Sequence, residues 1–249
     1  MSKTAIEWAE ETWNPISGCT KISPGCKFCY AEEQANWLKG MKVVGYENGF
    51  AVTVQETRMN EPLKRKKPTN YFVCSMGDLF HDQVKDQEID RILSITQQAS
   101  QHTYMVLTKR AERLPVFFKN RKVPDNVWIG VSVEDRKYGL PRIDYLRQVN
   151  AKTRFLSIEP LLENLGEFDL SGIHWVIVGG ESGNKTDSIR EMNKDWVISI
   201  RDKCLKSKIP FTFKQWGGYD KSKGGRILDD KVWDEKPVKV ITDLFSLAA

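Results

Sequence analysis

The chain has 249 residues and a formal net charge of +5, with 40% hydrophobic and 29% charged residues. This balance provides a buried core and argues against global disorder, and the length allows one large α/β domain or two small ones. The first residues contain no apolar signal segment, and no stretch reaches the roughly 18 apolar residues that a membrane span needs. We therefore expect a cytoplasmic protein with reduced thiols and no membrane partner.

A cysteine-rich segment lies near the start of the chain, after a short strand expected at residues 12–14. Three of the five cysteines stand there with the spacing C-x6-C-x2-C: Cys19, Cys26 and Cys29. The turn-forming residues between the first two predict a loop, and residues 29–38 favour a helix. The positive end of that helix dipole would favour thiolates and an anionic group beside them.

The cysteine spacing leaves two metal groups open. Thiolates are soft ligands for zinc and for iron–sulfur clusters, and three thiolates leave one coordination position free. Disulfides are disfavoured by the odd cysteine count and by the expected compartment, and a redox pair of the last two cysteines would leave Cys19 unexplained. A structural zinc would need a fourth ligand, and no candidate stands at a short repeated spacing from the three: Cys74, Cys204, His81, His102 and His174.

The rest of the chain reads as one α/β domain. Residues 40–70 are expected to be an insertion, and its basic run at residues 64–67 either contacts phosphates or is a solvated surface. Six short apolar runs follow and predict strands at 71–74, 103–107, 127–131, 154–156, 174–178 and 210–213. Helical stretches separate most of them, chiefly at 86–100, 139–149 and 193–206. A C-terminal extension begins at about residue 218, and residues 238–247 are expected to end it as a strand or helix.

This alternation predicts βαβ units and a parallel sheet. With the strand at 12–14 there would be about seven strands. That number suits a complete or partial TIM-type barrel, or an open doubly wound sheet.

Polar residues follow every one of the six apolar runs. Because the carboxyl ends of parallel strands meet at one edge, these residues would share one rim. Any single one of them is equally well explained as a loop cap or a surface charge, so the repetition over six strands is the signal. The candidates are Ser75, Asp78, Lys109, Arg110, Ser132, Glu134, Ser157, Glu159, Glu181, Ser182, Lys214 and Gln215.

Nearly the whole chain resembles the phage-associated three-Cys-motif protein family. The matching stretches lie around the cysteines and at most of the strand ends: 12–15, 18–21, 23–26, 29–31, 78–81, 107–110, 126–134, 155–162, 179–183 and 213–217. At greater depth the chain is similar to the radical S-adenosylmethionine superfamily, on its spore-photoproduct-lyase side. The usual spacing there is C-x3-C-x2-C, so the longer first gap of this chain requires a bulged loop.

The resemblance implies two cofactors. A [4Fe-4S] cluster would be held by Cys19, Cys26 and Cys29, with S-adenosyl-L-methionine on its fourth iron. The residues implied to bind S-adenosyl-L-methionine are an aromatic against the adenine, a pair for the methionine amino group and a pair for the ribose: Phe28, then Ser75 and Asp78, then Ser132 and Glu134.

The resemblance also implies a radical enzyme that generates a 5′-deoxyadenosyl radical with an electron from an external donor. Together with the positive net charge, the basic run and the many aromatic residues, the resemblance favours a nucleic-acid substrate, in repair or base modification. A peptide or small-metabolite substrate, or a non-catalytic metal-binding interaction module, are the alternatives. The residues expected to face the substrate are Glu159, Glu181, Lys109 and Lys214, with Tyr30 or Cys74 as a hydrogen-atom relay. The oligomeric state is not indicated.

Overall fold

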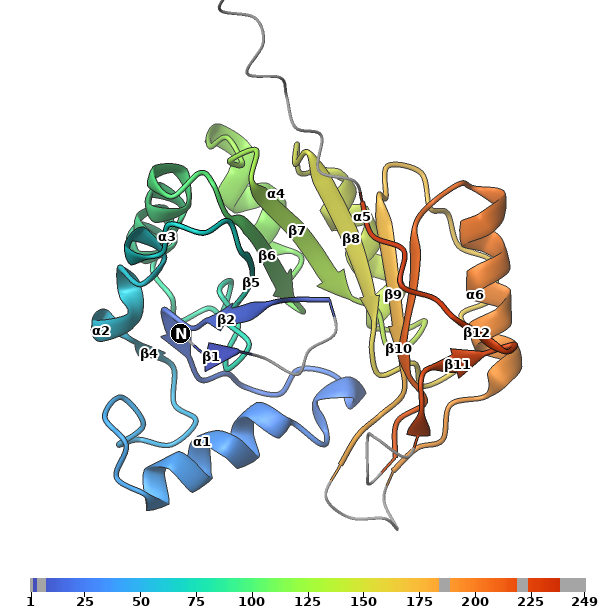
Figure 1. Cartoon of the computed structure of the whole chain (residues 1–249), viewed down its shortest axis with the longest axis horizontal. Helices are drawn as coiled ribbons and strands as arrows, with labels where there is room; N and C mark the ends of the chain where they lie inside the picture. Colours follow the sequence, from blue (N-terminus) through green and yellow to red (C-terminus); the bar gives the residue numbers. More distant parts are fainter. Residues whose placement is uncertain (1, 4–7, 184–188, 219–223, 238–249) are drawn as a thin grey trace, which may run out of the picture.

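The structure is a computed structural model that describes residues 2–3, 8–183, 189–218 and 224–237. Its centre is an eight-stranded sheet in the order β1-β2-β5-β6-β7-β8-β9-β10. The strands from β2 to β10 are parallel to their neighbours, whereas β1 pairs with β2 in the antiparallel sense. The sheet curves into a partial barrel (Figure 1). The strand bounds are β1 Ser2–Lys3, β2 Glu11–Trp13, β5 Asn70–Val73, β6 Thr103–Thr108, β7 Val127–Ser132, β8 Thr153–Ile158, β9 Trp175–Gly179 and β10 Phe211–Gln215.

The predicted fold class is confirmed, because each apolar run of the sequence forms one parallel strand of the partial barrel. The reason is visible in β9, whose five residues are all buried, as expected for a strand covered on both faces. Residues 159–174, between β8 and β9, contain no helix, so the alternation of strands and helices is incomplete there.

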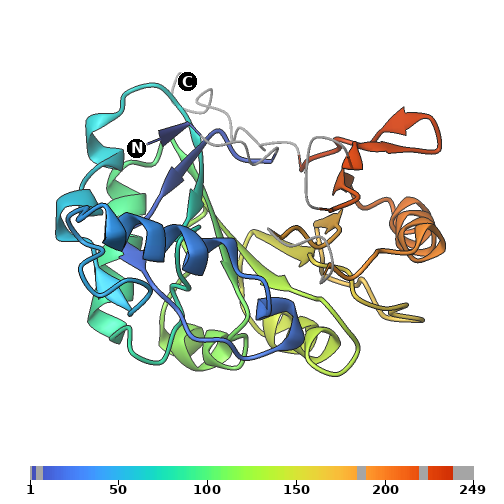
Figure 2. The same ribbon diagram turned by 90° about the horizontal axis from the view of Figure 1, so that it is seen from below.

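Helices cover the outer face of the sheet, and α1 lies beyond the carboxyl ends of the strands (Figures 1 and 2). One of the outer helices, α3, buries Ile89, Ile92 and Leu93 on one face, which follows from their helical spacing. The helix bounds are α1 Tyr30–Gly40, α2 Glu56–Met59, α3 Asp86–Gln98, α4 Arg113–Phe117, α5 Gly139–Arg147 and α6 Lys194–Lys206. Among the described residues, none of the helices is long and apolar enough to cross a membrane.

The sheet has a packed cluster on each face. In β5, Tyr71 and Val73 belong to the large outer core, whereas Phe72 belongs to a smaller cluster inside the barrel. Successive side chains of a strand point to opposite faces, so this alternation is expected. Trp8 lies in the inner cluster, with its ring centroid 4.5 Å from that of Phe72. The inner cluster therefore closes the barrel interior below the strand ends.

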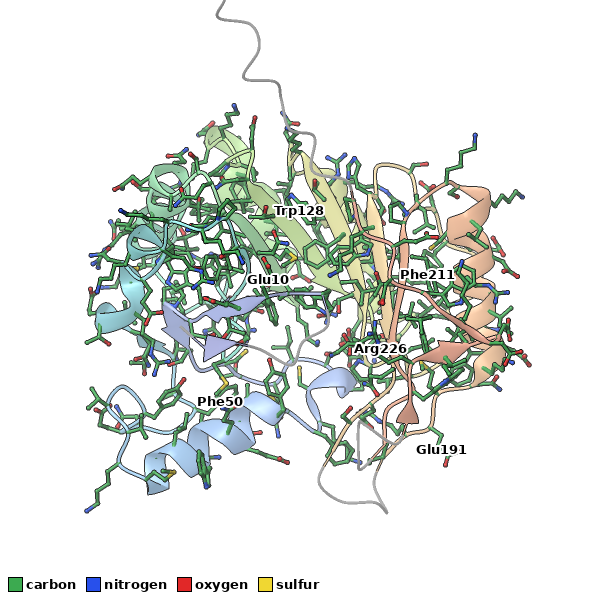
Figure 3. The ribbon with its side chains drawn as sticks, viewed as in Figure 1. Glu10, Phe50, Trp128, Glu191, Phe211 and Arg226 are labelled. Atoms are coloured by element: carbon green, nitrogen blue, oxygen red, sulfur yellow. The ribbon has the colours of Figure 1, made fainter. Side chains whose placement is uncertain are left out.

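Residues 40–70 pack onto the barrel through a short pair of strands, β3 Ile16–Ser17 and β4 Thr53–Val54. Tyr46 and Met59 of this segment are buried, and Phe50 lies beside α1 (Figure 3). That residues 40–70 are an insertion stays a prediction. Beyond residue 218, β11 Ile227–Leu228 and β12 Lys231–Val232 form a hairpin, and the strand or helix predicted at 238–247 lies outside the described residues.

Candidate functional site

A cavity of about 870 Å³ lies at the carboxyl ends of the strands. Strands β2 and β5 to β10 each place at least one lining residue at or just beyond their ends, among them Asn14, Ser75, Lys109, Ser132, Glu159, Glu181 and Lys214. This volume is near the top of the range of about 300–1,000 Å³ for small-molecule sites. The predicted shared rim therefore exists and encloses room for a nucleotide-sized ligand.

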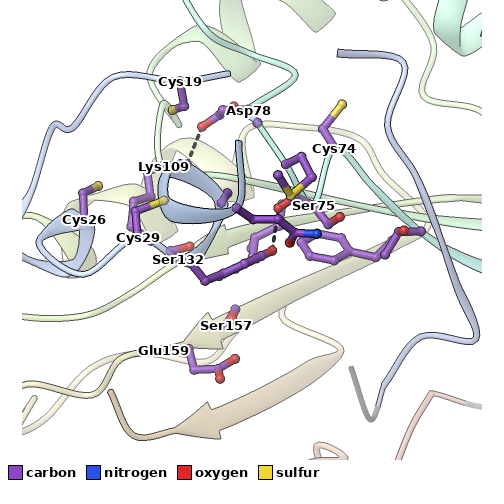
Figure 4. A pocket seen from close by; sticks show the side chains of 18 of the residues that line it. Cys19, Cys26, Cys29, Cys74, Ser75, Asp78, Lys109, Ser132, Ser157 and Glu159 are labelled. Carbon is purple, nitrogen blue, oxygen red and sulfur yellow. Dashed lines mark hydrogen bonds between the residues drawn. The ribbon is translucent and has the colours of Figure 1, made fainter. Parts of the chain in front are cut away.

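The three cysteines of the N-terminal loop line one side of this cavity (Figure 4). Cys26 ends a short 3-10 helix, η1 Pro24–Cys26, and Cys29 is the residue immediately before α1. The loop begins at Gly18, whose amide donates to the Met76 carbonyl at 2.8 Å. Gly18 has a φ of +87°, and a Cβ there would lie 2.2 Å from the Ala51 carbonyl oxygen, so this entry to the loop requires glycine.

Arg110 ties the first cysteine to the end of β6. Its Nη1 donates to the Cys19 sulfur at 3.2 Å and faces the Asp78 carboxylate at 3.4 Å, and its Nη2 donates to the Thr20 carbonyl at 3.0 Å. Asp78 is buried and also accepts a bond from the Thr108 hydroxyl at 2.8 Å. Asp78 was predicted to bind the methionine amino group; the structure shows its carboxylate bonded within the protein, at the rim of the cavity.

Glu134 anchors the middle of the cysteine loop. It is fully buried, it accepts a hydrogen bond from Arg142 of α5 at 2.6 Å, and the Ser23 hydroxyl donates to it. Burial disfavours its carboxylate, yet the positive charges of Lys109 and Arg142 hold the pKa of Glu134 below its usual value. Glu134 is therefore a charged brace under the loop, and its contact with the ribose stays a prediction.

The three thiols have different electrostatic surroundings. Burial, with the negative charge of Asp78, raises the pKa of Cys19 to about 11. Burial also raises the pKa of Cys29. Burial acts on Cys26 in the same sense, but the positive charge of Lys109 and hydrogen bonds from Ile22 and Ser23 lower the pKa of this thiol overall. Cys26 is therefore the thiol most readily converted to a thiolate ligand.

The placement of the thiols bears on which metal group they fit. Across the described residues, no three His, Cys, Asp or Glu side chains are grouped so that they could hold a metal ion. A zinc site needs every thiolate sulfur about 2.3 Å from one point. In an iron–sulfur cluster each thiolate binds its own iron, so the sulfurs stand further apart around one space. The three thiols line one cavity wall, and their soft donor set suits either group.

Near α1, a group of polar atoms surrounds Ser75. The Asn14 side-chain oxygen accepts from the Ser75 hydroxyl at 3.2 Å and from the Met76 amide at 3.0 Å. The Tyr30 hydroxyl donates to the Ser75 carbonyl, and the Phe28 ring lies on the cavity wall. Asn14 was not among the predicted site residues, although it follows β2 directly, as Ser75 follows β5 closely. Its position directly after a strand is the sequence feature that could have identified Asn14 as a site residue.

The opposite wall carries paired charges. Lys214 donates to the Glu159 carboxylate at 2.7 Å, and the Glu181 carboxylate accepts from Arg190 at 2.9 Å. Arg190 also donates to the Pro24 carbonyl in the cysteine loop at 2.9 Å. Sequence reasoning missed Arg190, because it follows no strand directly.

The hydroxyl groups and the proposed relay residues also lie around the cavity. Ser132 and Ser157 are register partners on β7 and β8, and both line the cavity. Cys74 and Tyr30 line it too. Burial raises the pKa of Cys74 to about 12, so this thiol stays protonated at neutral pH. Every predicted site residue thus lies on the cavity, except Glu134, which braces the loop beside it.

The comparisons with known proteins place the chain in a family. Residues 3–237 match the model of the family described as "Protein of unknown function (DUF5131)", and the chain belongs to that family. Its description mentions neither a phage association nor a cysteine motif, so those parts of the resemblance stay predictions. No curated protein matches the chain.

Among solved structures, the chain is similar to a cysteine-to-serine mutant of spore photoproduct lyase, with 14% identity and a TM-score of 0.44. It is also similar to a mutant of that lyase with bound AdoMet and dinucleoside spore photoproduct, with 13% identity and a TM-score of 0.40. Each alignment covers 80% of this chain and 62% of the other. A likeness this distant does not transfer a reaction or a substrate to the chain.

Proposed function

We propose that the chain is a radical S-adenosyl-L-methionine enzyme whose Cys19, Cys26 and Cys29 hold a [4Fe-4S] cluster. The observation that supports this most is that the three thiols and the polar ends of the parallel strands line one cavity of about 870 Å³. When bound, a reduced cluster would deliver one electron from an external donor to S-adenosyl-L-methionine, yielding methionine and the 5′-deoxyadenosyl radical that abstracts a substrate hydrogen.

The protein's part in this function is to bind, orient and exclude water. Phe28 offers a ring on the cavity wall against which an adenine can stack, and the Ser132 hydroxyl lies at the end of β7 as a ribose contact. The Ser75 hydroxyl donates to the Asn14 oxygen, so its own oxygen is oriented to accept a bond from an amino group. The inner aromatic cluster around Trp8 closes the base of the cavity against water.

The residues proposed to face the substrate are Lys109, Glu159, Glu181 and Lys214. Lys214 and Glu159 neutralise each other at 2.7 Å, and Arg190 neutralises Glu181. Most charges of this wall are thus already paired, so a highly charged substrate would have to displace internal ion pairs.

The position of the basic run bears on the substrate class. Residues 64–67 precede β5, whereas Ser75 follows it, so the run lies at the opposite end of the strand from the cavity. Within the run, Arg65 is paired with Glu11 at 2.9 Å. A phosphate bound by this run would therefore lie away from the cysteine side of the barrel. This placement favours a peptide or small metabolite that enters the cavity over a nucleic-acid substrate.

A direct test separates the two substrate proposals. Nucleic-acid binding would weaken steeply with salt, because phosphate contacts release counterions. Binding of labelled single- and double-stranded DNA and RNA, measured at low and high salt, would show this dependence if the nucleic-acid proposal is right. Absence of binding at low salt would leave the small-substrate proposal.

The non-catalytic module would require a site without room for a nucleotide ligand. The cavity of about 870 Å³ does have room for a nucleotide ligand. The interaction-module alternative therefore has no support from the shape of the site.

The deciding experiment for the cofactor is anaerobic reconstitution with iron and sulfide, followed by paramagnetic-resonance spectra with and without S-adenosyl-L-methionine. We expect about four irons per chain and a reduced-cluster signal that changes when S-adenosyl-L-methionine is added. Each of the variants Cys19→Ala, Cys26→Ala and Cys29→Ala should lose that signal. Cys204→Ala is the matched control, because Cys204 is buried in α6 away from the cavity lining. One tightly bound zinc, with no iron uptake and no response to S-adenosyl-L-methionine, would contradict the proposal.

A further inference from the structure

The Arg110 guanidinium is bonded to the start of the cysteine loop at several atoms. It donates to the Cys19 sulfur at 3.2 Å, to the Thr20 carbonyl at 3.0 Å and to the Thr20 hydroxyl at 2.8 Å. The Arg110 residue is 5% exposed, so these bonds form away from bulk water. Buried charge-assisted hydrogen bonds are stronger than neutral ones and hold geometry.

Arg110 is itself held from the end of β6. Its backbone amide donates to the Thr108 hydroxyl at 2.9 Å, and that hydroxyl donates to Asp78 at 2.8 Å. The Asp78 carboxylate also accepts from the Lys109 amide at 3.2 Å. The side chain that reaches Cys19 is therefore fixed to a central strand of the sheet.

The backbone of all three cysteines has local support, and that of Cys19 is held by its amide, which donates to the Phe50 carbonyl at 3.2 Å. Cys26 ends η1, with its amide bonded to the Ser23 carbonyl at 2.9 Å, and Cys29 is the N-cap residue immediately before α1. Cys19 lies on the far side of the six-residue gap from both. The backbone bonds of Gly18 and Cys19 fix the start of the loop but leave the Cys19 side chain free to rotate, so the bond from Arg110 to its sulfur is what orients this thiol.

We propose that Arg110 is a positioning residue that holds Cys19 at the cavity and, through its N–H···S hydrogen bond, raises the reduction potential of the cluster that Cys19 binds. This inference rests on the proposed function for its second half. Reduction makes a cluster more negative, and a donor hydrogen bond to a ligating sulfur stabilises that form. The guanidinium stays protonated at every relevant pH, so the donor is permanent.

The test uses Arg110→Lys and Arg110→Gln in the full chain. Lysine keeps the positive charge but has one nitrogen, which cannot serve Cys19 and both Thr20 oxygens as the fork does. Arg121→Lys is the matched control, because the Arg121 guanidinium contacts Asp90 and the Phe117 carbonyl rather than the cysteine loop.

The first measurement is hydrogen exchange on the metal-free protein. We expect amides of residues 18–22 to exchange about tenfold faster in both Arg110 variants, since a charge-assisted bond is lost. The control should match the wild type. The second measurement is a redox titration of the reconstituted proteins, in which both Arg110 variants should show a lower reduction potential than the wild type and the control.

The outcomes are separable from those of the proposed function. Unchanged exchange in both variants would overturn the tether, whether or not a cluster forms. Faster exchange with an unchanged potential would overturn the hydrogen bond's effect on the cluster. If the wild type takes up no iron, the proposed function fails, and the exchange measurement still decides whether Arg110 positions Cys19.

Discussion

At the scale of single residues, the cavity shows how an internal ion pair is kept in a mostly apolar barrel. The Lys214 and Glu159 side chains retain 18% and 15% exposure, and their charged atoms lie 2.7 Å apart. Removing one partner leaves the other charge poorly solvated, which costs more than the pair itself contributes. The pair is therefore coupled, and its two residues should not behave as independent sites.

Lys214→Met should lower the free energy of unfolding by about 2 kcal/mol, less than for a fully buried pair because both groups keep some solvent contact. Glu159→Gln should cost a similar amount of stability. The double variant should be more stable than the sum of the two losses predicts. Urea unfolding of the metal-free protein measures all three, and losses that add to within about 0.5 kcal/mol would show that the pair is not coupled.

The sequence identifies those site residues whose position follows from topology alone. Ser75, Lys109 and Glu159 each follow an apolar run, so the meeting of parallel strand ends predicts their common rim. Arg142 and Arg190 were missed, because they reach Glu134 and Glu181 from a helix and from a loop. Such partners depend on how helix and loop pack onto the sheet, and no spacing along the chain encodes that.

At the scale of elements, the pairing of β7 with β8 depends on a glycine. Gly130 is the register partner of Phe155, whose ring is buried inside the barrel beside Trp8 and Trp175. A Cβ at Gly130 would lie 2.4–2.6 Å from three carbon atoms of that ring. A methyl group there would push Phe155 into the inner cluster below the cavity.

Gly130→Ala should therefore lower the free energy of unfolding by about 1–3 kcal/mol through overpacking. Adding Phe155→Leu should recover part of the loss by making room for the methyl group. Gly40→Ala is the control, because a Cβ there meets nothing within 4 Å, and stability should stay equal or rise slightly. Chemical denaturation measures the three variants, and equal stability of Gly130→Ala and wild type would refute this account of the pairing.

The main elements could be predicted because their patterns are local. The buried strands are continuous apolar runs, and α3 repeats Ile89, Ile92 and Leu93 with helical spacing. The two-residue strands β3 and β4 could not be predicted. Their pairing joins residues 16–17 to 53–54, and runs of two residues carry no periodic signal.

At the scale of the whole molecule, the barrel separates its chemistry from its basic surface. The thiols and polar strand ends lie at the carboxyl edge, whereas residues 64–67 precede β5. Composition and charge describe the chain as a sum, so they could not show that these features stand at opposite ends of a strand. The fold supplies that information, and it shifts the proposed substrate towards a molecule that enters the cavity.

One buried histidine, His81, and one partly buried histidine, His174, link the stability of the whole molecule to pH. His174, just before β9, accepts the Arg154 amide at its Nδ1 at 3.1 Å. Burial, followed by the positive charge of Arg154, lowers the pKa of His174 below 6.5. Burial and the charge of Arg110 lower the pKa of His81 in the same direction. Both side chains thus stay neutral in the folded protein at a pH at which they are protonated in the unfolded chain.

Below about pH 6.5 the unfolded chain consequently binds more protons than the folded protein, so stability must fall as the pH decreases through that region. The loss continues until the lowered pKa values are reached. His174→Asn keeps an acceptor for the Arg154 amide but cannot take up a proton, so it should reduce this slope while changing stability little near pH 7. Urea unfolding of the metal-free protein between about pH 7.5 and about pH 5.5 measures both slopes. An identical slope in the variant would mean that His174 titrates alike in both states, and that its partial burial beside Arg154 does not resist protonation.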